Sequence, residues 1–109
     1  MDPRINYKKI FSDLKNSIHS LIGDQTRRII LFGSRARGDF NGDSDIDIAI
    51  IIPNLTKQIK NKILEEVAKI EFTYFVPLST HIFSEEQFQN LKKKERRIVF
   101  DIENEGIPL

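Results

Sequence analysis

The sequence contains no cysteine, no long hydrophobic run and no large excess of charge of one sign. Without cysteine the chain can have no disulfide, no thiolate metal site and no cysteine nucleophile, and it suits a reducing compartment. The longest aliphatic run, residues 48–52, is far too short to span a bilayer, and the N-terminal stretch lacks the apolar segment of a signal peptide. We therefore expect a soluble, cytoplasmic protein with no membrane partner.

The near-neutral charge also bears on binding partners. Seventeen Lys and Arg residues against 16 Asp and Glu residues give a formal net charge of +1, with both signs interspersed. A domain that binds nucleic acid usually has a concentrated basic surface. Direct nucleic-acid binding is therefore not expected, and the basic run at residues 92–97 (KKKERR) is interpreted as the solvated face of a helix.

The length of 109 residues predicts a single domain spanning residues 1–109. Apolar periodicity predicts helices, and β-branched runs predict strands. The helices are expected at Tyr7–Ile22, at Lys57–Glu71, in a short segment capped by Ser84 and Gln87, and in a last segment that ends at Gly106; the strands are expected at Arg28–Phe32, Asp45–Ile52 and Leu78–Phe83. This order predicts a small α/β or α+β fold with helices packed on a sheet.

Two carboxylates open the second predicted strand. Asp45 and Asp47 are two residues apart, so both side chains project from the same strand face. Like charges that converge in this way repel unless a cation lies between them, and Mg²⁺ prefers hard oxygen ligands from one or two carboxylates and substrate phosphates. The alternative is structural: the two residues cap the turn or pair with Arg35 or Arg37.

A polar turn follows the first predicted strand, in the segment GSRARG. Gly33 allows the backbone to approach a ligand closely, and a helix begun at Ser34 would direct N–H groups and the Ser34 hydroxyl at an anion. Arg35 and Arg37 would add charge-assisted contacts to phosphate oxygens. An ordinary polar β-turn with solvated arginines is the alternative for this hexapeptide.

The combination of these features is more specific than either alone. A hydrophobic strand, Gly33-Ser34, ten intervening residues and Asp45-Ile46-Asp47 at the start of another hydrophobic strand resemble the GS-x₁₀-DxD signature of the DNA polymerase β-like nucleotidyltransferase superfamily. The string GSRARGDFNGDSDIDIAI resembles its minimal nucleotidyltransferase (MNT) branch. The resemblance implies a palm-like mixed sheet of three or more strands flanked by helices, ATP phosphates at the Gly33-Ser34 turn, and Mg²⁺ on Asp45 and Asp47, with a two-metal site as one option.

The implied reaction is the in-line transfer of AMP from ATP to a hydroxyl, with pyrophosphate leaving. Relatives in this superfamily usually add a third carboxylate from a later strand. The matching segment here, Leu78–Phe83, contains no Asp or Glu, so Ser79 or a neighbour occupies that position. His81 is a candidate substitute base, although a single strand histidine is more often an ordinary packed residue.

The MNT resemblance also implies a partner. Proteins of this branch are commonly encoded beside a HEPN-domain protein, a helical ribonuclease toxin, and act as its antitoxin by transferring AMP to a tyrosine of the toxin. A second reading is a catalytically weak or inactive MNT domain that neutralises its partner by binding alone. A third is a small-molecule nucleotidyltransferase of the antibiotic-modifying kind, and both homodimers and partner-bound assemblies are compatible with the sequence.

Overall fold

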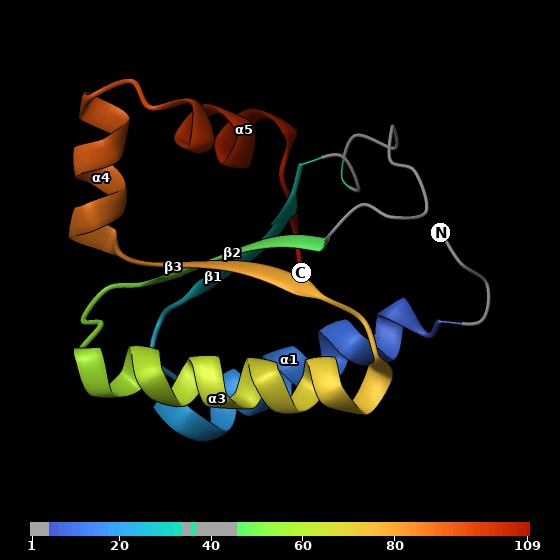
Figure 1. Cartoon of the computed structure of the whole chain (residues 1–109). Coiled ribbons are helices and arrows are strands. Elements are labelled where there is room, and N and C mark those ends of the chain that lie inside the picture. The colour runs from blue at the N-terminus through green and yellow to red at the C-terminus, as the bar shows by residue number, and fades with distance from the viewer. Residues whose placement is uncertain (1–4, 34–35, 37–45) are drawn as a thin grey trace.

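The computed structural model describes residues 5–33, 36 and 46–109. Helices lie on both faces of one sheet (Figure 1). The elements are α1 (Tyr7–Ile22), β1 (Arg28–Phe32), β2 (Ile46–Ile52), α3 (Lys57–Tyr74), β3 (Leu78–Ser84), α4 (Glu85–Lys93), α5 (Arg97–Glu105) and β4 (Ile107–Pro108).

The sheet is mixed, with the strand order β3-β2-β1-β4. Strand β2 pairs antiparallel with β1 and parallel with β3, and β1 also pairs antiparallel with β4. Helix α3 provides the crossover that parallel pairing of β2 and β3 requires. The mixed α/β sheet flanked by helices confirms the predicted fold class.

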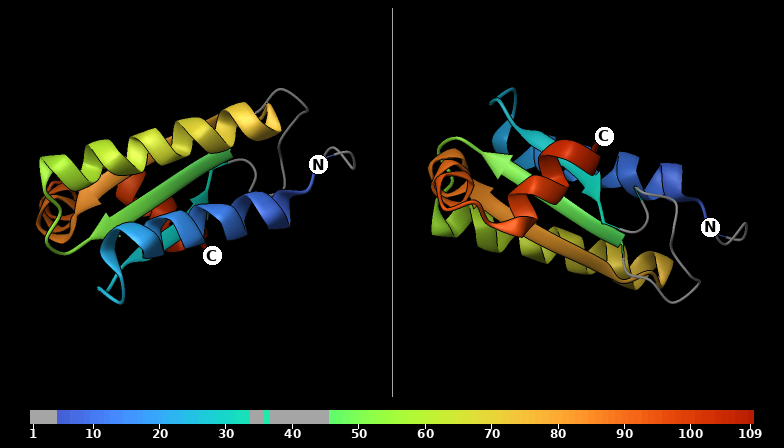
Figure 2. Two further views of the ribbon diagram at one scale, coloured as in Figure 1. Left: turned by 90° about the horizontal axis from the view of Figure 1, so that it is seen from below. Right: turned by 90° about the horizontal axis from the view of Figure 1, so that it is seen from above.

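The side chains of β2 divide the core into two layers, because successive residues of a strand face opposite sides of the sheet. Ile46, Ile48, Ile50 and Ile52 belong to the buried cluster under α1 and α3. Ala49 and Ile51 belong to the cluster under α4 and α5. Figure 2 shows α1 and α3 side by side on one face and α4 and α5 on the other. Both faces of the central strand are thus covered.

Most element boundaries agree with the sequence expectations. Helix α1 and strand β1 have the predicted limits, whereas α3 extends beyond Glu71 to Tyr74 and β3 beyond Phe83 to Ser84. The predicted capping box is confirmed: the Ser84 hydroxyl accepts a hydrogen bond from Gln87 N at 3.0 Å, and Gln87 Oε1 accepts one from Ser84 N at 2.9 Å. Strand β4 was not predicted.

The sequence had indicated that the basic run at residues 92–97 lies on one helix. The structure divides this run between two helices. Helix α4 ends at Lys93, and α5 begins at Arg97. Glu95, between them, has a φ of +55°, which ends a right-handed helix. The run therefore forms the corner between two helices.

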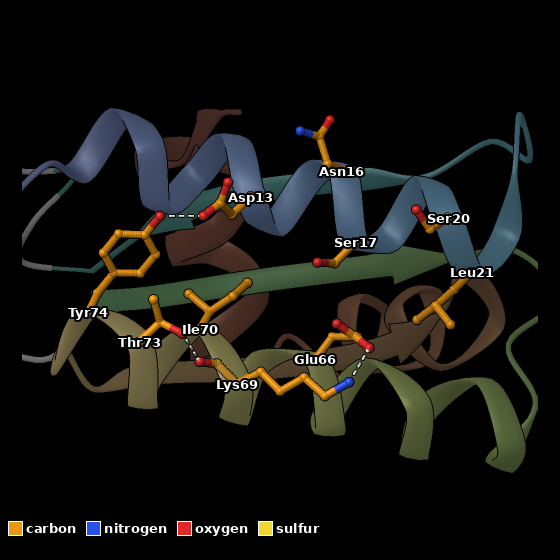
Figure 3. Close-up of a pocket in the computed structure, with 10 residues that line it drawn as sticks. All are labelled: Asp13, Asn16, Ser17, Ser20, Leu21, Glu66, Lys69, Ile70, Thr73 and Tyr74. Carbon is orange, nitrogen blue, oxygen red and sulfur yellow. Dashed lines mark hydrogen bonds and ion pairs between the residues drawn. The ribbon is translucent and has the colours of Figure 1, made fainter.

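A polar groove of about 500 Å³ lies between α1 and α3 (Figure 3). At one end of this groove the Tyr74 hydroxyl donates a hydrogen bond to the Asp13 carboxylate, which joins the end of α3 to α1. On the α3 side, Glu66 accepts a hydrogen bond from Lys69 at 3.1 Å. The Asp13 carboxylate raises the pKa of Tyr74 above its ordinary value, because the phenol must give up this hydrogen bond and face a negative charge when it ionises.

Replacement of Ser84 by Ala should destabilise the protein by about 1 kcal/mol, because the N-terminus of α4 loses its side-chain cap. Urea unfolding followed by circular dichroism measures this change. Ser12→Ala, at an exposed position of α1, is the matched control and should change stability by less than about 0.5 kcal/mol. Equal effects of the two substitutions would contradict a capping role.

The Asp13→Asn variant should titrate Tyr74 at a lower pH than the parent protein. The pKa of Tyr74 is raised in the folded state, so its contribution to stability is present below the unfolded-state pKa and is lost as the pH rises through the folded-state pKa. Phenolate absorbance during alkaline titration reports the midpoint. The measurement is made in a Tyr7→Phe background, since the chain has two tyrosines; an unchanged midpoint would show that Asp13 does not control Tyr74.

Candidate functional site

Gly33 and Asp47 lie against each other where β1 ends and β2 begins. Phe32 and Asp47 are register partners in the β1–β2 pair, and Gly33 follows Phe32 with a φ of +76°. A Cβ built on Gly33 would overlap Oδ2 of Asp47 and lie 3.2 Å from its Cγ. The carboxylate therefore occupies the space that a side chain at residue 33 would fill, and only glycine allows both this contact and this backbone conformation.

Strand β3 brings two further polar side chains to Asp47. Ser79 is its direct register partner, and His81 lies two residues further along the same face. His81 Nε2 is 3.9 Å from Asp47 Oδ1 and 3.4 Å from Ser79 Oγ. The side chains of Asp47 and His81 are about one-third exposed, at 31% and 34%, so solvent or a ligand reaches both.

An aromatic residue supports this group from the β1 side. The rings of Phe32 and His81 pack edge to face, with centroids 5.3 Å apart and an interplanar angle of 62°. Phe32 is only 6% exposed and belongs to the core under α4 and α5. It fixes the plane of the imidazole beside Asp47. Sequence analysis did not identify Phe32, because its role depends on the register between three strands.

Part of the predicted site lies outside the described residues. These site residues are Ser34, Arg35, Arg37 and Asp45. Ala36, within the same hexapeptide, is described: it is partly buried and packs against the core cluster under α1 and α3. Of the predicted site residues, the structure describes Gly33 and Asp47, which lie side by side.

The donor set at Asp47 suits a cation that is shared with a ligand. No group of three or more His, Cys, Asp or Glu side chains that could hold a metal ion occurs in the described part of the chain. Mg²⁺, however, is commonly held by one or two carboxylates, with phosphates and water completing its coordination. Asp47 offers a partly exposed carboxylate whose contact with His81, at 3.9 Å, is longer than a hydrogen bond. Among the described residues, no closer ion pair of these oxygens excludes an ion of this kind.

The helices of the described residues were compared with the length and hydropathy that a membrane-spanning helix needs. Among residues 5–33, 36 and 46–109, none of the helices is both long and apolar enough to cross a bilayer.

Two curated proteins of Methanocaldococcus jannaschii, both named as proposed protein adenylyltransferases, are similar to this chain. One is 29% identical over 100 residues, which cover 91% of this chain and 94% of the relative. The other is 43% identical over 47 residues, which cover 43% of this chain and 47% of the relative. The first similarity extends over nearly the full length of both proteins.

Two solved structures share the fold. A proposed nucleotidyltransferase from Sulfolobus solfataricus has a TM-score of 0.56 and 18% identity, and the match covers 92% of this chain and 76% of that chain. A second proposed nucleotidyltransferase has a TM-score of 0.56 and 26% identity, and the match covers 91% of this chain and 96% of that chain. The first supports the fold alone.

The sequence model of the nucleotidyltransferase domain matches residues 9–107. These residues include both strands that meet at Gly33 and Asp47, and β3 with Ser79 and His81. Because the match spans almost the whole chain, the protein belongs to the nucleotidyltransferase domain family, as the GS-x₁₀-DxD resemblance predicted.

Proposed function

We propose that this chain is a Mg²⁺-dependent protein adenylyltransferase that acts as a single domain, residues 1–109. The observation that carries the proposal is the contact of the Asp47 carboxylate with the backbone of Gly33, which joins the expected metal ligand to the expected phosphate-binding turn. The names of the two curated relatives support protein adenylylation as the activity. Family membership supports a nucleoside triphosphate as the donor.

In this proposal the chain holds ATP at the edge of the sheet where β1 ends and β2 begins. Gly33 and Ser34 bind phosphates through their N–H groups, Arg35 and Arg37 neutralise phosphate charge, and Asp45 and Asp47 are the carboxylate ligands. When bound, Mg²⁺ supplies charge neutralisation of the triphosphate and alignment of the reacting oxygens, from one or two ions.

The reaction forms one bond and breaks one bond. The acceptor hydroxyl oxygen bonds to the α-phosphorus of ATP, the bond from that phosphorus to the bridging oxygen breaks, and pyrophosphate leaves; the hydroxyl proton passes to solvent or to a basic group. Because β1 and β3 pair with β2 on either side of Asp47, the carboxylate is held in place before the nucleotide binds. Such preorganisation is what makes electrostatic stabilisation effective.

The acceptor in the proposal is a tyrosine hydroxyl of a HEPN-domain toxin encoded by the neighbouring gene, and the chain is its antitoxin. The support is the resemblance of GSRARGDFNGDSDIDIAI to the MNT branch, together with the protein-directed activity in the names of the relatives. The proposed compartment is the cytoplasm, where ATP and the toxin's RNA substrate are found.

A second candidate function is neutralisation of the same partner by binding without catalysis. The observation that favours it is the composition of β3. Its register places Ser79 opposite Asp47 and His81 beside it, so this strand contributes a hydroxyl and an imidazole where superfamily relatives usually have a third carboxylate. A weak or absent transfer activity would follow if that carboxylate is essential for deprotonating the acceptor.

The Asp47→Asn variant should lose at least about 100-fold in transfer of labelled AMP from ATP to the purified HEPN-domain protein. The amide keeps the shape of the side chain but removes the negative charge that balances the cation, which is worth several kcal/mol in the transition state. Scintillation counting of the partner's band after electrophoresis measures the transfer rate.

The control for this substitution is Asp101→Asn, on α5, where the carboxylate pairs with Arg97 at 3.2 Å. It makes the same chemical change away from β2 and should leave the rate unchanged. Stable binding of the partner with no label, for the parent chain as well as for Asp47→Asn, would instead support the binding module. Full activity of Asp47→Asn would exclude the proposed site.

The variants Gly33→Ala and Gly23→Ala form a matched pair. Comparing them distinguishes the effect of overlap with Asp47 from the effect of backbone strain. Both glycines have positive φ, +76° and +63°, so alanine should strain the backbone at each, at a cost of about 1–3 kcal/mol of stability. Only at residue 33 does the added Cβ overlap Asp47; at residue 23 it meets nothing within 4 Å. We expect Gly33→Ala to lose AMP transfer and Gly23→Ala to keep it in the same assay, with urea unfolding as the stability measurement. Equal losses of activity would show that strain alone is responsible.

A further inference from the structure

Helix α3 carries an exposed apolar stripe in addition to its buried face. The buried face consists of Ile63, Val67 and Ile70, and the groove toward α1 is lined by polar residues of the opposite flank. The first three members of the stripe lie at the spacing i, i+4 and i+8 on one side of α3, and the fourth is the residue that follows the helix. Its members, named here the α3 stripe, are Leu64, Ala68, Phe72 and Phe75.

The two phenylalanines of the α3 stripe are almost fully exposed. Phe72 is 79% exposed and Phe75 is 84% exposed, and Leu64 is 42% exposed. The two rings pack against each other with centroids 6.2 Å apart, so they form one continuous apolar surface. From the sequence, the position of Phe72 and Phe75 before a strand favours packing in the core or at an edge, with exposed rings on a partner surface as the alternative; the structure shows both rings exposed. Adjacent exposed rings of this kind are typical of interaction sites rather than of scattered surface residues.

The backbone at Phe75 adds an independent observation. This residue ends α3 with a φ of +53° and a ψ of +41°, the left-handed conformation that glycine normally supplies at the end of a helix. A bulky side chain in this conformation is a genuine outlier. Phe75 therefore combines backbone strain with exposure of an apolar ring. This conformation ends α3, as the φ of +55° at Glu95 ends the helical path between α4 and α5, and it sets the position of the exposed Phe75 ring.

The α3 stripe lies beside the edge of the sheet that leads to Asp47. Glu71, on the flank of α3 that carries the stripe, accepts a hydrogen bond from Leu78 N at 2.9 Å, which ties this flank to the first residue of β3. Leu78 is the register partner of Ile46, directly before Asp47. Strand β3 is also an edge strand of the sheet. The end of α3 thus lies at the same end of the sheet as the candidate site (Figure 1). The Asp47 side chain points to the opposite face, which α4 and α5 cover, so a protein on the stripe reaches it around the β3 edge.

The extent of the apolar surface indicates what covers it. Two phenyl rings bury at most roughly 300–500 Å², whereas a stable protein–protein interface buries about 800 Å² on each partner. A second copy that packs stripe against stripe would fall short of this area. A protein that also reaches the neighbouring site would cover the stripe, the β3 edge and the region around Asp47 in one interface of ordinary size.

We propose that the α3 stripe is the docking surface for the acceptor protein, and that an apolar helix face of the acceptor lies along it. The inference rests on the proposed function, because the occupant is the protein that receives AMP. Apolar residues repeated at helical spacing on α3 match the ridges and grooves of a second helix. Phe72 and Phe75 act as the central apolar contacts, and the acceptor hydroxyl is presented at Asp47 from the β3 side.

The test measures binding of the purified HEPN-domain protein to Phe72→Ala, Phe75→Gly and the double variant by titration calorimetry without ATP. Each single substitution should weaken binding by at least about tenfold, since buried aromatic contacts dominate interfaces. Phe75→Gly also removes the backbone strain, so its urea midpoint should be unchanged or higher while its affinity falls. A purely structural role for Phe75 would move both quantities in the same direction.

Ile107→Ala is the matched control, because Ile107 is 46% exposed on β4, at the edge of the sheet opposite β3. It should change the affinity by less than about twofold. Unchanged affinity in the α3 stripe variants overturns the proposal. Weaker ATP binding by these variants would assign the rings to the nucleotide base, and dissociation of a parent dimer by the double variant, seen by light scattering, would assign them to a second copy; both outcomes also overturn it.

The outcome for docking is separable from the outcome for catalysis. Binding is measured without ATP, so the affinity for the partner does not depend on AMP transfer. Stripe-dependent binding with no AMP transfer would retain the docking surface and reject the transferase. AMP transfer with an unchanged KM for the partner in the stripe variants would retain the transferase and reject the docking surface. Absence of any binding by the parent chain would overturn the docking surface for this partner.

Discussion

The structure depends on the burial of β2 on both faces with one carboxylate left accessible near its start. Six of the seven residues of this strand are apolar, and those six are at most 1% exposed. Asp47 is the exception, and burial of an unpaired carboxylate in such a strand would be costly. Gly33 removes this cost, because its missing side chain leaves the space in which the carboxylate reaches solvent. The apolar strand fixes the backbone and the glycine opens the site.

Much of this arrangement was predictable because its signals are local. The apolar period of α1, the β-branched run of β1 and the Ser84–Gln87 pattern each lie within one segment of sequence, and all three have the expected structure. The proximity of Gly33 and Asp47 was expected from the resemblance to the GS-x₁₀-DxD signature, because the connection of residues 33–45 is by itself long enough for parallel as well as antiparallel pairing.

The remaining features depend on tertiary context that a single sequence does not contain. Ser79 could be placed opposite Asp47 only with the parallel register of β2 and β3, and β4 has two residues whose strand character exists only through pairing with β1. The exposure of Phe72 and Phe75 could not be predicted for a different reason. Apolar residues favour the interior, but this rule does not hold in reverse for the surface, so composition alone could not reveal their exposure.

The alternation of side chains along β2 links accurate folding to function. Phe32 faces Asp47 across the β1–β2 pair; a slip of one residue would turn Asp47 into the layer beneath α1 and α3 and would rotate the isoleucines of that layer toward α4 and α5. A misaligned chain would therefore lose its carboxylate and its well-packed core together. Inactive molecules that arise in this way would also expose apolar side chains. Proteolysis of poorly packed chains would therefore also remove the chains that lack an accessible Asp47.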